Sequence, residues 1–418
     1  MSIRTPLAVC YASALFVVSS QALALPFGAM DPYSFSMGGT GVASGTSANA
    51  GNYNPALLAT FERDDRYSMQ LPLGIRKYDQ DKVHDDLAGY QDRLLEYNYN
   101  TALNNFKLAS ADDDNVDLSD ELGAVEEHGI ELFTQLSRLG EKPMHREFLG
   151  GVVVGIPHDK VAMSLIVDVR VVGGAVINVT DNDLDELERV INAANQGTLS
   201  SAETFDSSQF TSAMNGRGVT MTEFKLAMAQ ERKFLGYEMA VGVTPKYIKA
   251  TTFDYATPGN LDSADFDSSL GQWDSDAIDV DVGVAKRYGS GWSTGFTITN
   301  LIGQKYDTVL GNQIKVNPQA RLGVSHSTQW TLVAIDLDLN EANAVGFHSA
   351  TQYVAIGAEL DVFDMVDLRI GYRHNMSDTA TSLATTGIGM EVFGAQLDMA
   401  LGANEDEIAV SAQLGFSF

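Results

Sequence analysis

Apolar and polar residues alternate along much of this chain from about residue 148 onward. Each run lasts some ten positions and ends in a turn. The last run has apolar side chains at every second position, namely Ile408, Val410, Ala412, Leu414, Phe416 and Phe418. Because successive side chains of a strand point to opposite faces, each run predicts a β-strand with one apolar and one mixed polar face. The chain is therefore expected to be all-β.

Two architectures produce such strands. A soluble sandwich turns the apolar faces toward each other, whereas a transmembrane barrel turns them toward lipid. The runs are about 9–11 residues long, which is the length that a tilted strand needs to cross the hydrocarbon layer. Short turns such as 288–292 also alternate with long polar loops such as 175–218 and 254–274. We predict a transmembrane antiparallel β-barrel, with a soluble β protein as the alternative.

The predicted barrel has about fourteen strands, an even number as in bacterial outer-membrane barrels. They lie at roughly 66–78, 147–157, 161–173, 219–232, 237–253, 276–288, 292–301, 314–325, 330–340, 350–361, 367–376, 385–393, 395–402 and 406–418. Aromatic residues gather at the short turns and predict a girdle at the periplasmic interface: Phe234, Tyr237, Tyr288, Trp292, Trp330, Phe363 and Phe393.

The first 24 residues have the form of a cleaved secretory signal peptide. Arg4 supplies a positive charge, residues 7–18 are apolar, and Ala22-Leu23-Ala24 is a cleavage site. The mature chain would begin at Leu25 and would contain no thiol, because Cys10 is the one cysteine of the sequence. We expect export to the outer membrane of a bacterial cell.

Composition excludes several functions. The chain has 55 acidic and 27 basic residues and a net charge of −28, so it would repel a phosphate backbone and is not expected to bind nucleic acid. The acidic stretch 112–117 lacks the glycine that a calcium-binding EF-hand loop requires. The histidines show no metal-binding spacing, and no serine-hydrolase elbow is present. We predict no enzymatic activity, no cofactor and no metal.

Residues 25–60 fit no strand pattern and precede the first strand. They contain a glycine-rich stretch with Gly38, Gly39 and Gly41, followed by Asn54-Pro55-Ala56. A barrel of about fourteen strands is too wide for its own inward side chains to seal. This segment is therefore expected to fold into the lumen as a plug.

These features resemble the FadL-type outer-membrane transport family, and most of all its TraF-like branch, which is named after plasmid conjugal transfer. The resemblance rests on Met37–Ala43, on Asn54-Pro55-Ala56 and on the closing residues 414–418. It implies a signal peptide at 1–24, a lumen-plugging hatch at 25–60 and a barrel at 61–418.

The resemblance also implies a function. Members of that family take up small hydrophobic or amphipathic compounds passively, so this chain would be a monomer in lipid and lipopolysaccharide that admits such a ligand. Phe416 and Phe418 would form the signal that the outer-membrane assembly machinery reads.

The first loop, residues 79–146, departs from the fatty-acid transporter because it is very long and helical in pattern, with Leu87, Tyr90 and Leu94 on one face. A shorter helix is expected after Thr180, with Asp183 completing a capping box. The family's ligand-groove residues therefore cannot be transferred. An alternative function follows, in which the barrel is an anchor and the helical loop docks a partner in conjugal transfer.

Charged residues on the polar strand faces should point into the lumen, because a charge on the lipid face costs about 2–4 kcal/mol near the bilayer centre. The candidates are Asp168, Arg170, Glu223, Lys225, Arg369 and Arg373. Two interpretations stay open. The charges form an ion-paired interior that holds the plug, or they form a polar pathway that guides a ligand's head group.

Overall fold

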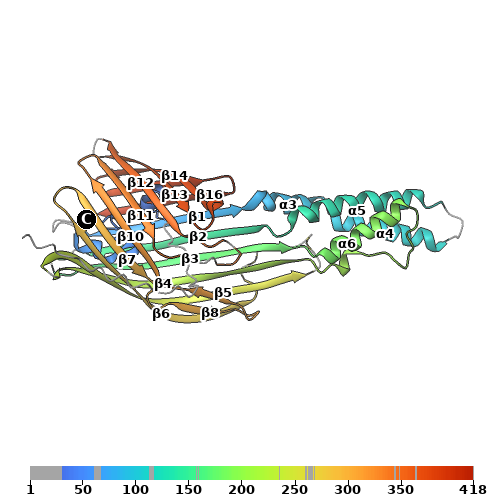
Figure 1. Cartoon of the computed structure of the whole chain (residues 1–418), viewed down its shortest axis with the longest axis horizontal. Coiled ribbons are helices and arrows are strands. Elements are labelled where there is room, and N and C mark those ends of the chain that lie inside the picture. Colours follow the sequence, from blue (N-terminus) through green and yellow to red (C-terminus); the bar gives the residue numbers. More distant parts are fainter. Residues whose placement is uncertain are drawn as a thin grey trace, which may run out of the picture.

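The chain forms a closed antiparallel barrel with a helical extension at one end (Figure 1). The computed structural model describes residues 31–60, 67–112, 117–156, 158, 160–234, 236–258, 261, 267, 269–342, 345–347, 349–362 and 365–417. The predicted signal peptide, residues 25–30, Phe363 and Phe418 lie outside these ranges. Strand β1 closes the ring by pairing with β16 on one side and with β2 on the other.

Fourteen strands make up the closed barrel, and both the count and the fold class predicted from the sequence are confirmed. The strands are β1 (Ser68–Asp79), β2 (Pro143–Ile156), β3 (Ala162–Asn178), β4 (Ala213–Phe234), β5 (Tyr237–Pro258), β6 (Gln272–Arg287), β7 (Trp292–Thr299), β10 (Gln319–Ser327), β11 (Thr331–Asp338), β12 (Tyr353–Val362), β13 (Val366–Asn375), β14 (Leu383–Val392), β15 (Ala395–Ala403) and β16 (Glu407–Ser417).

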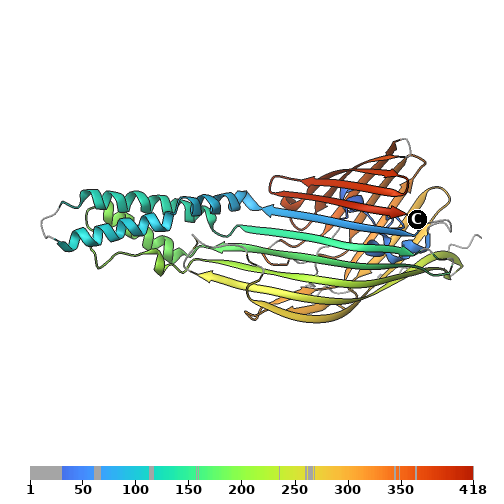
Figure 2. The ribbon, with the colours of Figure 1, turned by 180° about the vertical axis from the view of Figure 1, so that it is seen from behind.

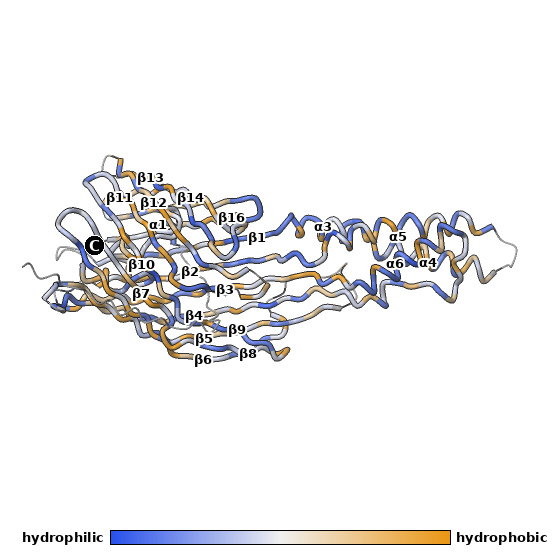
Figure 3. Tube along the Cα trace, in the orientation of Figure 1, coloured by the Kyte–Doolittle hydropathy of each residue, from blue (hydrophilic) through white to orange (hydrophobic). Residues whose placement is uncertain are grey.

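Most of the large apolar side chains of these strands point outward, away from the barrel interior. On β5, Tyr237 and Tyr247 are exposed at the two ends of an outward apolar row, and Lys249 follows beside Asp276 of β6. Ten residues of strand at a tilt of about 40° span roughly 25 Å along the barrel axis, which is the height of the apolar band on outer-membrane barrels. Figure 3 shows the alternation of hydrophobic and hydrophilic residues along the strands. The outer surface is therefore built for lipid.

Strands β3 to β5 are much longer than a membrane crossing requires. β4 and β5 have 22 residues each, whereas β7 and β11 have 8. About a dozen surplus residues extend β4 and β5 beyond the lipid band by roughly 40 Å, measured along the strand. At their upper ends the predicted strands stop at residues 219 and 253, whereas β4 and β5 extend to Ala213 and Pro258. The prediction fell short because outside lipid the outward face no longer has to be apolar.

The helices of the extension stand on these long strands (Figure 2). They are α3 (Val83–Asp92), α4 (Leu95–Asp112), α5 (Ser119–Leu139) and α6 (Asp181–Asn195), with a 3₁₀ turn η2 (Gln80–Lys82) before α3 and η3 (Ser207–Gln209) after α6. We call α3 to α6, together with the upper ends of β2 to β5, the tower. None of the described helices is both long and apolar enough to cross a membrane.

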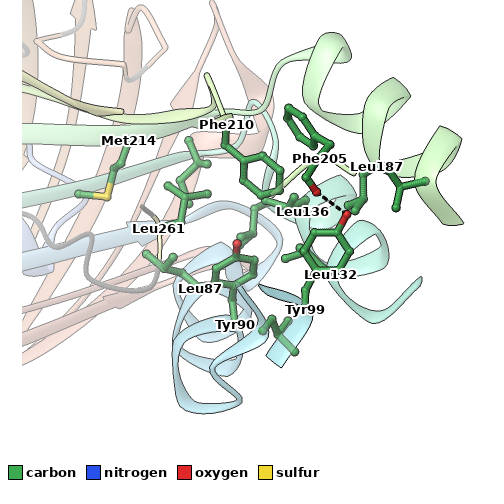
Figure 4. Packing of buried hydrophobic residues seen from close by; sticks show 14 of the residues in the cluster. Leu87, Tyr90, Tyr99, Leu132, Leu136, Leu187, Phe205, Phe210, Met214 and Leu261 are labelled. Atoms are coloured by element: carbon green, nitrogen blue, oxygen red, sulfur yellow. Dashed lines mark hydrogen bonds between the residues drawn. The ribbon is translucent and has the colours of Figure 1, made fainter. Parts of the chain in front are cut away.

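The tower has a hydrophobic core of its own (Figure 4). Leu87, Tyr90, Leu132 and Leu136 are buried in it. The expected face that included Leu94 is wrong at that residue, because Leu94 has a positive φ of 51° between α3 and α4 and is half exposed. The loop 79–146 is helical as predicted only to residue 139, since β2 begins at Pro143.

Polar side chains tie the tower together. The Tyr99 hydroxyl donates a hydrogen bond of 2.8 Å to the Phe205 carbonyl, as drawn in Figure 4. The predicted capping box on α6 is wrong: Thr180 makes no side-chain cap, and the Asp183 carboxylate instead accepts hydrogen bonds from Thr211 and Ser212. Burial acts to raise the pKa of Asp183, but these hydrogen bonds outweigh it and lower the pKa.

Residues 31–60, which we call the inner segment, lie against the inward faces of the barrel strands. The segment contains α1 (Pro32–Ser36), α2 (Ala50–Tyr53) and the 3₁₀ helix η1 (Pro55–Thr60). α1 contacts β13 to β16, and η1 contacts β3 to β6, so the segment crosses the lumen from one wall to the other. Its side chains are almost all buried.

A second element also folds inward. β8 (Gln304–Asp307) and β9 (Gln313–Val316) form a two-stranded hairpin between β7 and β10, which we call the inward hairpin. Tyr306 and Ile314 pack against inward-facing residues of β4 and β5, including Val219 and Ile248. The predicted strand 314–325 wrongly merged β9 with β10, although Pro318 interrupts them.

We predict that Ile370→Arg destabilises the barrel. Ile370 lies at the middle of β13 and is 65% exposed on the outward face, so an arginine there would cost up to about 2–4 kcal/mol in lipid. The free energy of unfolding in lipid vesicles, measured by urea titration, should fall accordingly. Thr101→Arg on the exposed surface of α4 is the control, and equal stability of all three proteins would contradict the lipid-facing assignment.

Candidate functional site

A cavity of about 110 Å³ lies inside the barrel between the inner segment and the inward hairpin. We call it the chamber. The inner segment contributes Asp31, Asn52 and Tyr53 to its wall, and the hairpin contributes Tyr306 and Val316. The remaining wall comes from inward side chains of the barrel strands. The chamber is therefore bounded by two separate insertions into the lumen.

Three of the predicted lumen charges meet on one wall of the chamber. The Lys225 ammonium lies 2.7 Å from Asp168 and 2.8 Å from Glu223. Lys246, which the sequence analysis had not singled out, lies 2.8 Å from Asp281 on the neighbouring strand. These side chains come from β3 to β6, whose register places them side by side. The positive and negative charges of this wall are paired with each other.

Arg170 belongs to a second group. Its guanidinium lies 2.6 Å from Glu147, which also pairs with Arg76 at 3.3 Å. Glu407 of β16 joins the group by pairing with Arg76 at 3.1 Å and with Arg373 at 2.9 Å. The group links β1, β2, β3, β13 and β16 across the seam where the barrel closes. Its ion pairs hold the wall of the barrel rather than the inner segment.

Arg369 forms a third group on the opposite side of the inner segment. Its guanidinium lies 2.6 Å from Glu359, 2.7 Å from Asp367 and 2.7 Å from Asp398. The same guanidinium lies 4.5 Å from the centre of the Tyr33 ring, which is cation–π distance. The structure thus places the six predicted lumen residues in three groups rather than in one site.

The inner segment is held mainly through its backbone. The Asp336 carboxylate accepts hydrogen bonds of 2.9 and 3.0 Å from the backbone nitrogens of Gly41 and Val42. The Arg321 side chain donates to the Gly39 carbonyl at 3.1 Å, and the Gly38 nitrogen donates to the Thr385 hydroxyl at 2.9 Å. Gly38 and Gly39 have φ values of +73° and +88°, which side chains other than glycine rarely adopt. The glycine-rich stretch therefore presents its backbone groups to the barrel wall.

Glycines of the barrel wall lie directly against the inner segment. A Cβ at Gly371 would lie 2.1 Å from the Gly38 nitrogen, and a Cβ at Gly295 would lie 2.1 Å from the Val42 carbonyl oxygen. Among the described residues, inward-facing glycines lie this close to the inner segment on eight strands: Gly242, Gly283, Gly295, Gly323, Gly357, Gly371, Gly387 and Gly402. We call these residues the glycine band. Any larger side chain there would push the inner segment away from the wall.

Asn54-Pro55-Ala56 lies where the inner segment meets β5 and β6. The Asn54 side-chain amide donates to the carbonyls of Val42 at 2.9 Å and Val284 at 3.1 Å, and its oxygen accepts from the Ala56 nitrogen at 3.1 Å. Asn54 thus connects two turns of the inner segment to the barrel wall. Pro55 begins η1, where its missing N–H costs no hydrogen bond.

The other side of the inner segment faces open cavities of about 440 and 600 Å³ at the short-turn end. Residues 43–47 of the inner segment line the first cavity together with Trp292 and Trp330. The inner segment therefore separates the chamber from the short-turn end.

Phe416 of the predicted assembly signal is half exposed on the barrel surface, where it pairs in register with Met69 of β1.

Two residues that the sequence analysis missed line the chamber as well. Tyr306 and Gln319 are nearly completely buried. Within the part of the chain that the structure describes, the Tyr306 hydroxyl and the Gln319 side-chain nitrogen have no hydrogen-bond partner. No alternation or motif marks them, because Tyr306 lies in a hairpin outside the barrel ladder. Among the described residues no group of three or more His, Cys, Asp or Glu side chains could hold a metal ion.

Comparison with solved structures shows the same fold in outer-membrane channels. A TodX deltaS2S3 mutant monoaromatic hydrocarbon channel superposes with a TM-score of 0.50 and 11% identity, covering 93% of this chain and 99% of that chain. The P. putida toluene transporter TodX gives 0.50 and 10%, covering 92% and 97%. A Pseudomonas aeruginosa FadL homologue gives 0.49 and 11%, covering 93% and 98%.

Comparison of the sequence itself is more specific. No curated protein matches the chain. The model of the family described as "F plasmid transfer operon, TraF, protein" matches residues 51–338, which is more than half of the sequence. The match includes Asn54-Pro55-Ala56, the tower and strands β1 to β11. The chain belongs to this TraF family and has the FadL-type outer-membrane barrel fold.

Proposed function

We propose that this protein admits small hydrophobic or amphipathic compounds passively through the outer membrane. The observation that carries the proposal is the chamber, which lies in the lumen of a lipid-facing barrel and is bounded by both polar and apolar side chains. The solved barrels that share the fold are described as hydrocarbon channels and toluene transporters, which supports the same assignment.

In this function the inner segment is the hatch, as the resemblance implied. It separates the chamber from the cavities at the short-turn end, so a compound must pass it or leave sideways. In outer-membrane barrels the short turns face the periplasm, which puts the tower outside the cell. A monomer suffices for this function, because one closed barrel contains the whole chamber.

The family name favours a second candidate function, in which the barrel anchors a docking element for conjugal transfer. The tower supports it, because it extends far beyond the lipid and displays apolar side chains to solvent. Tyr97 and Leu108 of α4 are 64% and 69% exposed. Neither side chain belongs to the buried core of the tower.

The uptake function predicts that filling the chamber blocks entry. Val316→Trp adds bulk to the chamber wall, and initial uptake of radiolabelled toluene by whole cells should fall several-fold, toward that of cells without the protein. Val309→Trp is the matched control, because Val309 lies exposed at the turn of the same hairpin. Equal uptake by cells with and without the wild-type protein, for toluene and also for an oxygen-bearing aromatic such as acetophenone, would refute the function.

The hatch assignment predicts that loosening the inner segment opens the pore. Gly371→Leu and Asp336→Ala should each raise single-channel conductance in planar bilayers several-fold, because they displace the Gly38 backbone or remove the acceptor of two hydrogen bonds. Gly289→Leu is the control, since a side chain there meets open space. Unchanged conductance in both variants, with correctly folded barrels, would contradict the assignment.

The docking candidate predicts a separation of phenotypes. Tyr97→Ser combined with Leu108→Ser should lower mating frequency tenfold or more and leave toluene uptake unchanged, whereas Ile302→Ser, exposed outside the tower, should change neither. Substitutions are preferable to deleting the loop, because loss of α5 would expose Leu187 and Val190 of α6. Normal mating in the double variant would count against docking through this face.

A further inference from the structure

Two hydrogen-bond donors of the chamber have no partner within the described part of the chain. The Tyr306 hydroxyl is on β8 and the Gln319 side-chain nitrogen is on β10, and both residues line the chamber. Each side chain is at most 2% exposed, and among the described residues neither donor has a partner. A buried polar group without a partner is unfavourable, so such groups in a binding cavity are expected to be satisfied by what binds there.

The charged groups of the chamber, in contrast, already have ion-pair partners. Lys225, Lys246 and Arg170 each lie within 2.8 Å of a carboxylate. Removing a cation from a buried pair to bind a ligand carboxylate would leave the protein carboxylate unpaired, which is costly. Among the described residues, the chamber therefore offers no unpaired cation for an anionic head group, and its acidic residues are equally occupied.

Part of the chamber wall is apolar, formed by Pro72, Leu149, Val153, Met221 and Ile248, and the neutral polar residues Asn52, Thr299 and Asn300 also line it. A volume of about 110 Å³ is of the same order as the engineered cavities of roughly 150 Å³ that bind a single benzene molecule. The size and the mixed polar and apolar wall both favour a compact molecule that has one ring or a short chain together with a polar atom.

We propose that the chamber selects a small, neutral, oxygen-bearing hydrophobic molecule, such as an aromatic ketone, whose oxygen accepts hydrogen bonds from Tyr306 and Gln319. The proposal rests on the uptake function and adds the substrate class to it. It distinguishes this chamber from one that takes a bare hydrocarbon, which accepts no hydrogen bond, and from one that takes a carboxylate, which needs a free cation.

Binding of three ligands of nearly equal size tests the selection. Radiolabelled acetophenone, ethylbenzene and benzoate are compared by equilibrium dialysis against the protein in lipid nanodiscs, with empty nanodiscs subtracted. Wild-type protein should bind acetophenone most tightly. Tyr306→Phe and Gln319→Leu should each weaken acetophenone binding roughly 2- to 10-fold, the value of one hydrogen bond, and leave ethylbenzene binding unchanged. Tyr237→Phe, which changes a tyrosine exposed on the barrel surface, should alter neither.

The outcomes separate the two proposals. If wild-type protein binds ethylbenzene as tightly as acetophenone, and neither variant changes the ratio, water satisfies the two donors and the selection is wrong, while uptake can still operate. If benzoate binds as tightly as acetophenone, the neutral class is wrong. If none of the three binds above empty nanodiscs and cells show no uptake, the uptake function itself fails. Heat-modifiable gel mobility checks that each variant is folded. Folding is expected, because both substitutions remove an unpaired donor and create no new one.

Discussion

Closure of the backbone hydrogen-bond ladder is the constraint on which this structure depends. In lipid an unpaired strand edge cannot be satisfied by water, so β1 has to pair with β16 along its length. Closure fixes which residues point outward and which point inward. Once the outward row of β13 includes Ile370, the inward row has to contain Arg369, Gly371 and Arg373, and the lumen acquires both charges and a glycine. The ion pairs, the glycine band and the chamber follow from this division.

The same constraint explains how much of the fold the sequence predicted. Where strands cross lipid, alternation is enforced and all fourteen were found, with β15 starting at the predicted Ala395. Outside lipid the enforcement ends. The upper ends of β4 and β5, residues 213–218 and 254–258, were missed and β8 was not predicted, because outside lipid the outward face of a strand no longer has to be apolar. The alternation of side chains predicts that a charged residue points into the lumen, but it does not predict which residue will be its ion-pair partner. Lys225 meets Asp168 only through the register of β3 and β4.

The barrel holds the inner segment largely through the segment's backbone. Gly38 and Gly371 approach each other because neither has a side chain, and Asp336 and Thr385 bind main-chain groups rather than side chains. Because a side chain at these glycines would clash with the opposite backbone, the interface tolerates few substitutions on either side. Periodicity alone did not reveal it. The signal was present, however, in glycines at inward positions of successive strands, such as Gly295 beside Gly323 and Gly357 beside Gly371.

Strand β5 is continuous from Tyr237 to Pro258. At Gly242 it touches Ala56 of the inner segment, and at Phe253 and Tyr255 it belongs to the core of the tower. One continuous strand therefore joins the tower to the inner segment that crosses the lumen. A sideways force on the tower would act on β5 and its hydrogen-bonded neighbours together. The tower is therefore mechanically coupled to the inner segment in the lumen.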